Sequence, residues 1–301
     1  MENKGRNEPN LINEEYQYLS LAKTIMETGF EETGRNGVTK SIFGASMRFS
    51  LRDGQIPILT TKKTAWKTCL KELLWFIRGE TSVSSLQKEN VHIWDGNATK
   101  EFLESRGLKH YEDGDLGPVY GFQWRHYGTQ WEGSSKKYDG HGIDQLQNII
   151  KQLLNEETRT SRRLVMTAWN PKQLDQMALP PCHIMCQFNV HDKNKLSCSM
   201  YQRSGDVGLG VPFNIASYSF LTHLLAQHCG LVAHEFVYFL GNAHIYDDHY
   251  EAISEQLKRT PYDFPTVQII KKRDNISDYK VDDFVIEGYR CHERINMDMR
   301  V

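Results

Sequence analysis

One cysteine, Cys182, follows two prolines and precedes a histidine, so the backbone that carries its thiol is stiff. Residues 184–190 and 196–202 have the composition of two β-strands, and a polar turn at 191–195 separates them. Antiparallel pairing about this turn places Arg203 roughly opposite Cys182. Because a guanidinium beside a thiol stabilises the thiolate, this spacing predicts a cysteine nucleophile with a lowered pKa.

The residues that follow the second strand suit an anionic ligand. The run from Arg203 to Asp206 offers a guanidinium, a hydroxyl and flexible backbone N–H groups, which together suit a phosphate. A second pair of cations, Arg162 and Arg163, opens a predicted strand at 164–169, where neighbouring residues face opposite sides. Taken alone, such a pair is equally consistent with a solvated surface.

Three further polar positions have two interpretations each that the sequence leaves open. Glu72 lies among apolar residues in a predicted helix at 66–77, either on an exposed face or as a buried acid with a raised pKa. Asn214 precedes a predicted helix and suits an N-cap, while its amide also suits the edge of a pyrimidine. His244 and Tyr246 share one side of an extended segment, as packed aromatics or as ligand contacts.

Composition places the chain among ordinary globular proteins. Of its 301 residues, 39% are hydrophobic and 25% are charged, which is enough for a substantial core. A net charge of -2 gives no general positive field for nucleic acid, and no apolar run reaches the ~20 residues of a membrane span. Without a secretory signal, the six cysteines are expected to be free thiols in a reducing, cytoplasmic compartment.

The cysteine and histidine spacings do not predict a metal site. Cys182 and Cys186 flank His183, but no second pair of ligands follows at zinc spacing. The spacing of the other histidines does not match the four-residue separation of a helical metal site. We expect most of the remaining cysteines to be small buried hydrophobes, namely Cys69, Cys186, Cys198 and Cys229.

Periodicity predicts long helices mixed with hairpin-type strands, which indicates a single α+β domain over residues 13–301. Its sheet is expected to be mixed or antiparallel and packed by helices, with a flexible segment at 1–12. Helices are predicted at 11–34, 66–77, 143–154 and 215–229, and strands at 41–51, 164–169, 184–190, 196–202, 236–240, 267–271 and 284–286. Two polar segments, 97–114 and 128–142, are predicted to be surface excursions.

From about Tyr16 onward the chain resembles the thymidylate synthase family. The strings that carry the resemblance are ELLWF at 72–76, GPVYG at 117–121, SRR at 161–163, PCH at 181–183, YQRS at 201–204, PFNIASY at 212–218 and HIY at 244–246. It implies a methyltransferase that converts dUMP to dTMP with 5,10-methylenetetrahydrofolate and releases dihydrofolate. Because the folate supplies both carbon and hydride, neither a nicotinamide nor a metal is expected.

The resemblance also implies a role for each matching position. Cys182 adds to C6 of the uracil ring, and further catalytic roles are implied for Glu72, Tyr120, Arg203 and Asp206. The residues implied in dUMP binding are Arg162, Arg163, Arg203, Ser204, Gly205, Asp206, Asn214, His244, Ile245 and Tyr246. Those implied in folate binding are Lys62, Trp94, Asp206, Gly210, Phe213 and Arg300, and Val301 corresponds to a closing carboxylate.

A homodimer follows from the same resemblance. The sheet is expected at the dimer interface, and Arg162 and Arg163 are expected to reach the phosphate site of the partner subunit. Neither a membrane nor a nucleic acid is expected as a partner. Composition gives no independent sign of dimerisation, so this expectation rests on the family alone.

Three positions depart from the family pattern. Glu32 stands where the family has a phosphate-binding arginine, and a carboxylate repels phosphate. Arg35, in the same glycine-rich loop, is the predicted substitute. Ala65 stands where some members have a histidine near the folate tail, which predicts a weaker grip there. Arg300 replaces a small residue, either to contact a polyglutamate tail or to lie in solvent.

Three rival functions remain open from the sequence. A pyrimidine hydroxymethylase of the same fold uses water in place of hydride, but its dCMP-specific members carry aspartate where this chain has Asn214, which favours dUMP. A thiol hydrolase that pairs Cys182 with a histidine predicts activity without folate. A silent nucleotide- or RNA-binding protein predicts binding that survives the loss of Cys182, and the near-neutral charge argues against it.

Overall fold

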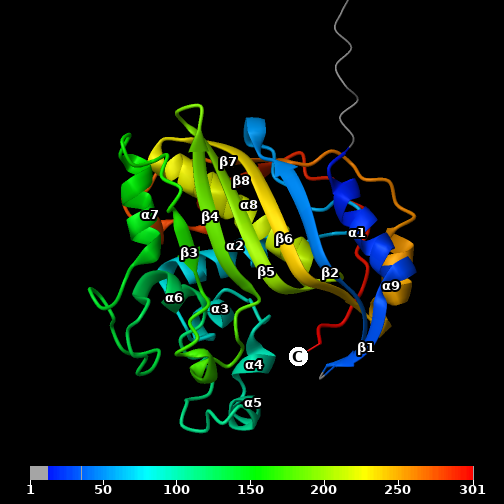
Figure 1. Cartoon of the computed structure of the whole chain (residues 1–301), viewed down its shortest axis with the longest axis horizontal. Coiled ribbons are helices and arrows are strands. Elements are labelled where there is room, and N and C mark those ends of the chain that lie inside the picture. The colour runs from blue at the N-terminus through cyan, green and yellow to red at the C-terminus, as the bar shows by residue number, and fades with distance from the viewer. Residues whose placement is uncertain (1–12, 35, 301) are drawn as a thin grey trace, which may run out of the picture.

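A six-stranded sheet in the order β1-β2-β6-β5-β4-β3 forms the centre of the protein (Figure 1). The structure is a computed structural model that describes residues 13–34 and 36–300. The predictions made for residues 1–12, for Arg35 and for Val301 lie outside these described residues. The strands are β1 Phe30–Gly34, β2 Gly37–Ser50, β3 Val165–Thr167, β4 His183–His191, β5 Lys195–Asp206 and β6 Val232–Tyr246, with a separate antiparallel pair β7 Thr266–Ile269 and β8 Phe284–Glu287.

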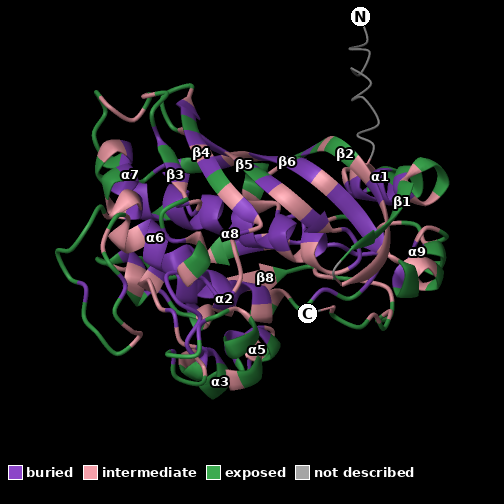
Figure 2. Cartoon of the chain, turned by 60° about the horizontal axis from the view of Figure 1, so that its bottom comes forward, coloured by how far each residue is buried: buried purple, intermediate pink, exposed green. Residues whose placement is uncertain are grey.

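Helices cover one face of this sheet and its flanks. Helix α8 packs against β5 and β6, and α2 packs against α8, so α8 is buried along nearly its whole length (Figure 2). Such burial suits α8 because it is apolar on every side. The helices are α1 Glu15–Thr28, α2 Trp66–Arg78, α3 Ser84–Lys88, α4 Asp95–Ala98, α5 Lys100–Ser105, α6 Tyr120–His126, α7 Gln145–Leu154, α8 Gly210–Cys229 and α9 Tyr250–Gln256, with short 3-10 turns at Arg52–Gly54, Leu174–Gln176, Asp247–His249, Ile276–Asp278 and Val281–Asp283.

Strands β5 and β6 are the parallel neighbours in a sheet whose other described pairs are antiparallel. A parallel pair needs a crossover connection, and α8 supplies it. The pairing sets residues 204–206 of β5 beside residues 242–244 of β6. In open sheets, ligands bind beyond the carboxyl ends of parallel strands, so this end of the pair is where we expect a site.

The opposite face of the sheet carries exposed apolar side chains. Val165, Met185, Tyr201 and Phe239 are each between 36% and 44% exposed. The strand register sets Met185 beside Tyr201 and Tyr201 beside Phe239, so these side chains form one patch across four strands. A contiguous apolar patch of this kind marks an interaction surface.

The predicted α+β class, with a mixed sheet packed by helices, is confirmed. One helix prediction was wrong, because the segment 11–34 does not stay helical: α1 ends at Thr28, and residues 30–34 pair with β2 as a hairpin. The segment 97–114 is more than a surface excursion, since it contains α5 and fully buries Leu103. Within the described residues, no helix is both long and apolar enough to cross a membrane.

Candidate active site

The β4–β5 hairpin joins Cys182 to Arg203, as the spacing predicted. The backbone N–H of Arg203 donates to the carbonyl oxygen of Cys182 at 2.8 Å. Its guanidinium donates to the carbonyl oxygens of Pro181 at 2.8 Å and Pro180 at 3.0 Å, and lies 5.8 Å from the centre of the Trp169 ring. Arg203 therefore fixes the backbone that carries the thiol, and its remaining N–H groups are suited to an anion.

Partial burial changes the prediction for the Cys182 thiol, because Cys182 is neither fully buried nor fully exposed. Removal from water raises its pKa above the ordinary value, and the Arg203 guanidinium opposes that rise without cancelling it. The expectation of a lowered pKa is therefore wrong for the free protein, because desolvation of the thiolate outweighs its attraction to one cation. Without a ligand, the nucleophile is held as a protonated thiol.

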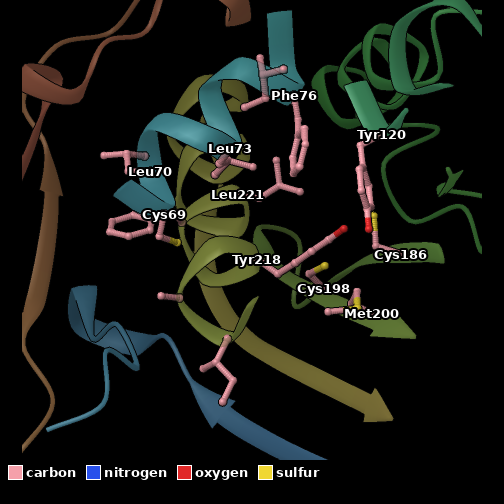
Figure 3. Packing of buried hydrophobic residues seen from close by; sticks show 14 of the residues in the cluster. Cys69, Leu70, Leu73, Phe76, Tyr120, Cys186, Cys198, Met200, Tyr218 and Leu221 are labelled. Carbon is pink, nitrogen blue, oxygen red and sulfur yellow. The ribbon is translucent and has the colours of Figure 1, made fainter. Parts of the chain in front are cut away.

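An aromatic layer lies behind Cys182. The Cys182 N–H donates to the Tyr120 hydroxyl at 2.8 Å, and the Tyr120 ring stacks on His183 with 4.2 Å between centroids. His183 Nδ1 lies 2.7 Å from the Tyr218 hydroxyl, and burial lowers the pKa of His183 to about 3. Figure 3 shows Phe76, Tyr120 and Tyr218 extending from three helices into this layer. So weak a base does not deprotonate a thiol at neutral pH, which argues against the thiol hydrolase.

Glu72 is a buried acid and does not lie on an exposed face. It is 6% exposed on α2 and accepts a hydrogen bond from the Trp94 indole N–H at 2.7 Å. Burial raises the pKa of Glu72 to about 7, against the opposing effect of the Trp94 hydrogen bond. The Trp94 ring that donates to Glu72 meets the Tyr120 ring edge to face, with 6.0 Å between centroids, so Trp94 links Glu72 to the aromatic layer behind Cys182. An acid of this pKa exchanges protons near neutral pH, as general acid–base chemistry requires.

His244 and Tyr246 lie together at the carboxyl end of β6, as predicted. Their rings meet edge to face with 5.2 Å between centroids. The Nδ1–H of His244 donates to the Asn242 side-chain oxygen at 2.9 Å, and Asn242 pairs with Ser204 across the parallel strands. Sequence reasoning missed Asn242, although its spacing of two from His244 along one strand was a usable signal. Asp206 pairs with His244, so the end of β5 joins the same polar cluster.

Gly205 and Ile245 offer no side chain to this cluster. A Cβ on Gly205 would lie 2.6 Å from Leu240 and 2.9 Å from Val211, so close packing requires glycine there. Ile245 is fully buried in the hydrophobic core. Any contact that these two predicted nucleotide-binding residues make with a ligand must therefore use the backbone.

Asn214 is buried inside α8 and does not cap it. The helix begins at Gly210 with Leu209 at the capping position, so the N-cap interpretation was wrong. A Cβ on Gly210 would lie 3.8 Å from Asp206 Cβ and 3.9 Å from Asn214 Oδ1, so the Asn214 amide and Asp206 share one corner of the site. A buried amide needs hydrogen-bond partners, and the pyrimidine edge inferred from the sequence supplies an acceptor and a donor.

Two of the predicted folate-binding residues, Lys62 and Phe213, lie close to Asp206 and Asn214 in the chain or in space. The Lys62 ammonium donates to the Gly208 carbonyl and lies 3.9 Å from the sulfur of Met297. Burial lowers the pKa of Lys62 to about 8. Phe213, on α8, packs against the core, and its carbonyl accepts a hydrogen bond from the Cys69 thiol at 3.3 Å.

Arg300 is ion-paired, which neither of its two predicted roles anticipated. Its guanidinium donates to Asp248 at 2.9 Å, to Asp247 at 2.9 Å and to the Asn36 carbonyl at 3.1 Å. It also lies 5.7 Å from the centre of the Tyr246 ring. The expectation of a solvated side chain is wrong, because two carboxylates engage it.

Arg162 and Arg163 are exposed in the turn that precedes β3, and not on the strand. The argument that strand neighbours face opposite sides therefore does not apply to them. Glu32 is exposed on β1, where it pairs with Thr39. Its predicted substitute in phosphate binding, Arg35, lies outside the described residues.

The buried cysteines behave as predicted. Cys69, Cys186, Cys198 and Cys229 are buried free thiols. Across residues 13–34 and 36–300, no group of three or more histidine, cysteine, aspartate or glutamate side chains is arranged to hold a metal ion.

The protein is thus of the α+β class. Polar side chains of its candidate site gather at the carboxyl end of the parallel strands β5 and β6, close to the Cys182 thiol. The chain belongs to the thymidylate synthase family, whose family model matches residues 16–301.

Relatives of two lengths are similar to this chain. The bifunctional dihydrofolate reductase-thymidylate synthase of Plasmodium berghei (strain Anka) is 52% identical over 286 residues, which are 95% of this chain and 48% of the relative. The thymidylate synthase of equine herpesvirus 2 (strain 86/87) is 50% identical over 95% of this chain and 98% of its own length. That of Homo sapiens is 48% identical over 98% of this chain and 93% of its own length. The chain thus spans about half the length of the Plasmodium protein and nearly all of the other two.

Proposed function

We propose that this chain is a thymidylate synthase, a methyltransferase that converts dUMP to dTMP and 5,10-methylenetetrahydrofolate to dihydrofolate. The observation that carries the proposal is the hairpin joining Cys182 to Arg203, in a chain that belongs to this family. The folate supplies one carbon and one hydride, so the proposed reaction uses neither a nicotinamide nor a metal. Free thiols throughout the described chain support a reducing compartment, and we propose the cytoplasm.

Cys182 is the proposed nucleophile toward C6 of the uracil ring. Its sulfur forms a bond to C6, and the displaced electron pair makes C5 a carbon nucleophile that takes up the one-carbon unit. Loss of the C5 proton and cleavage of the bond between the transferred carbon and the folate nitrogen leave an exocyclic methylene on the ring. A hydride from the folate adds to this methylene as the sulfur departs from C6, which gives the methyl group of dTMP and dihydrofolate. Because the pKa of the free thiol is raised, the thiolate must form once substrate and Arg203 share the site.

Glu72 is proposed to carry the protons of these steps. Its pKa of about 7 allows both protonation states at neutral pH. Trp94 links it to Tyr120, whose hydroxyl contacts the Cys182 backbone. Trp94 holds the Glu72 carboxylate by a 2.7 Å hydrogen bond, which fixes its direction. Glu72 is therefore suited to serve as acid and base in alternate steps.

Asn214 is proposed to select uracil. Its amide offers an acceptor to the ring N–H and donors to a carbonyl, whereas a carboxylate would suit the cytosine amino group. The burial of Asn214 beside Asp206 supports this role, because a mismatched base would leave a buried polar group unpaired. This favours dUMP over dCMP, and so the synthase over the dCMP hydroxymethylase.

The proposed phosphate site combines Arg203 and Ser204 of one subunit with Arg162 and Arg163 of its partner in a homodimer. The exposed apolar patch on the open sheet face supports dimerisation through that face. Placement of Arg162 and Arg163 in an exposed turn beside β3, the edge strand, leaves both guanidiniums at the surface that a partner could share.

The change Tyr201→Asp is expected to dissociate the dimer. A charge in the middle of the patch would be desolvated without a partner, at a cost of several kcal/mol. Sedimentation would show a monomer, and activity would fall with it because the phosphate site would lose the partner's arginines. A monomeric Tyr201→Asp variant with full activity would contradict the shared site, and Tyr16→Asp, an exposed tyrosine on α1, is the matched control.

The change Arg35→Ala is expected to raise the KM for dUMP by about tenfold, since one charged hydrogen bond to phosphate contributes on that order. The reason is that Glu32 cannot bind phosphate, which leaves Arg35 as the cation of that loop. Steady-state kinetics at fixed folate would measure the change, with Arg294→Ala as the control. An unchanged KM would show that Arg35 does not replace the missing arginine.

A covalent-trapping experiment tests the proposed function. The protein is incubated with 5-fluoro-dUMP and methylenetetrahydrofolate, and its intact mass is measured. A synthase accumulates a ternary adduct on Cys182, because fluorine does not leave C5 as a proton does, and Cys182→Ser forms none. Folded protein without adduct would overturn the proposal, and dihydrofolate release with dUMP but not dCMP would separate the synthase from a hydroxymethylase.

A further inference from the structure

Residues 297–300 run beside the polar corner described above. Figure 1 shows this end of the chain approaching β1, and the Arg300 guanidinium reaches the carbonyl of Asn36 in the β1–β2 turn. At its other end the segment presents the Met297 sulfur to Lys62. A Cβ on Gly208 would lie 3.3 Å from that sulfur, so Met297 also packs against the loop that follows Asp206.

His249 ties the middle of this segment to the same loop. The ring is fully buried, and its Nε2–H donates to the Asp298 carbonyl at 2.8 Å. Its other ring nitrogen, Nδ1, lies 3.8 Å from a carboxylate oxygen of Asp206. One ring therefore contacts the 297–300 segment on one side and faces the proposed folate ligand Asp206 on the other.

Three charged residues, Arg300, Asp247 and Asp248, form what we call the Arg300 clasp. The two carboxylates directly follow Tyr246, and each accepts a 2.9 Å hydrogen bond from the guanidinium. The fit is close, since a Cβ on Gly37 would lie 2.5 Å from Arg300 Nη1. The clasp thus joins three parts of the chain: the segment 297–300, the end of β6 and the β1–β2 turn.

The clasp does not suit an anionic folate tail. The Arg300 donors Nε, Nη1 and Nη2 are all engaged within the protein. Two carboxylates against one guanidinium leave the cluster negative overall, and a polyglutamate would be repelled. What the clasp can do is hold the segment in place.

We propose that the Arg300 clasp fixes residues 297–300 across the junction of the nucleotide and folate sites, which makes Arg300 a positioning residue for folate binding. This inference rests on the proposed function for the identity of the two ligands. The clasp fastens the segment to the residue after Tyr246, the proposed ribose contact, while Met297 and His249 fasten it beside Lys62 and Asp206. Breaking the clasp should therefore let residues 297–300 move away from the folate site, although no residue proposed to contact a ligand is changed.

The experiment compares Arg300→Ala, Arg300→Lys and the double variant Asp247→Asn/Asp248→Asn with the wild type. Arg294→Ala, which replaces an exposed arginine that precedes the segment, is the matched control. In the ligand-free protein, hydrogen exchange at residues 297–300 is expected to be about three- to tenfold faster in Arg300→Ala and in the double variant, as expected for the loss of two partly exposed ion pairs. Lysine is expected to restore part of the protection.

In kinetics, the KM for the folate is expected to rise by a similar factor of about three to ten while the KM for dUMP changes less than twofold. Combining Arg300→Ala with the double variant should add nothing further, because both remove the same clasp. Added salt should reduce the difference between wild type and Arg300→Ala, since partly exposed ion pairs are screened. A merely structural role would instead lower the melting temperature and affect both substrates equally.

Unchanged exchange in Arg300→Ala would overturn the clasp, whatever the activity. Faster exchange with an unchanged folate KM would overturn its positioning role. If the wild type forms no adduct with 5-fluoro-dUMP, the proposed function fails, and the ligand-free exchange measurement still decides whether the clasp exists. Melting temperatures confirm that each variant is folded before any comparison.

Discussion

Replacing Arg203 with alanine is expected to lower kcat/KM for dUMP on the order of a thousandfold, because a charged hydrogen bond to phosphate and a cation beside the thiol are both removed. The guanidinium lowers the pKa of the Cys182 thiol against the effect of burial. Its loss leaves burial unopposed, so that pKa rises further and the thiolate fraction at neutral pH falls. The Pro180 and Pro181 carbonyls also lose their donors, which loosens the backbone behind the thiol.

The pH dependence of alkylation separates these losses. Iodoacetamide modification mapped to Cys182 by peptide mass should have its midpoint at higher pH in Arg203→Ala than in the wild type. Arg203→Lys keeps the charge but not the forked donor geometry, so it should retain most of the thiol reactivity and lose affinity for dUMP. A raised KM with an unshifted alkylation midpoint would show that Arg203 binds phosphate and does nothing for the thiol.

Replacing Glu72 with glutamine is expected to lower kcat by about 10² to 10⁴, the usual contribution of a general acid or base. Glutamine keeps an acceptor for the Trp94 indole, so the packing of α2 is preserved. The pH profile of kcat should lose an ionisation near 7, which the raised pKa of Glu72 supplies in the wild type. A profile that keeps this ionisation in Glu72→Gln would assign it to another group.

The same change is expected to stabilise the protein at alkaline pH. Because the pKa of Glu72 is about 7 in the fold and 4.5 as a model acid, the folded chain binds its proton more tightly than the unfolded chain does. Wild-type stability should therefore fall as pH rises from about 4.5 to about 7, by an amount on the order of 3 kcal/mol. Urea unfolding at pH 5 and pH 8 should show this loss in the wild type and not in Glu72→Gln.

The centre of the candidate site could be predicted from local sequence. Counting residues outward from the turn at 191–195 placed Cys182 close to Arg203, because an antiparallel hairpin takes its register from its turn. The irregularity between His183 and Met185 then shifts the pairing by one residue, from Ser204 to Arg203. Alternation along one strand likewise brought His244 and Tyr246 together. These predictions succeeded because each concerns residues joined by one regular element.

The failures concern packing that no short window contains. Glu72 lies on α2, which packs against α6 and α8, and Cys182 contacts Tyr120 of α6. These elements lie far apart in the sequence, so neither raised pKa could be predicted from neighbouring residues. Helix α8 begins at Gly210, earlier than predicted, and contains Pro212 in its first turn, where a helix tolerates proline. Strand β6 continues past Gly241, beyond the predicted strand at 236–240, because it pairs with β5. These two strands are separated in the sequence by the whole of α8. The ion pairs of Arg300 join residues more than fifty positions apart.

The crossover through α8 also sets an order of assembly. The β4–β5 hairpin closes over a short turn, whereas β6 can join β5 only after the intervening helix has folded back across the sheet. Closing the longer loop costs more chain entropy and is slower. A chain emerging during synthesis would therefore carry its paired thiol and guanidinium before the end of β6 is in place. The Cys182–Arg203 pair would form early during folding. The site would be complete only when β6 pairs with β5 and brings His244 and Tyr246 into place.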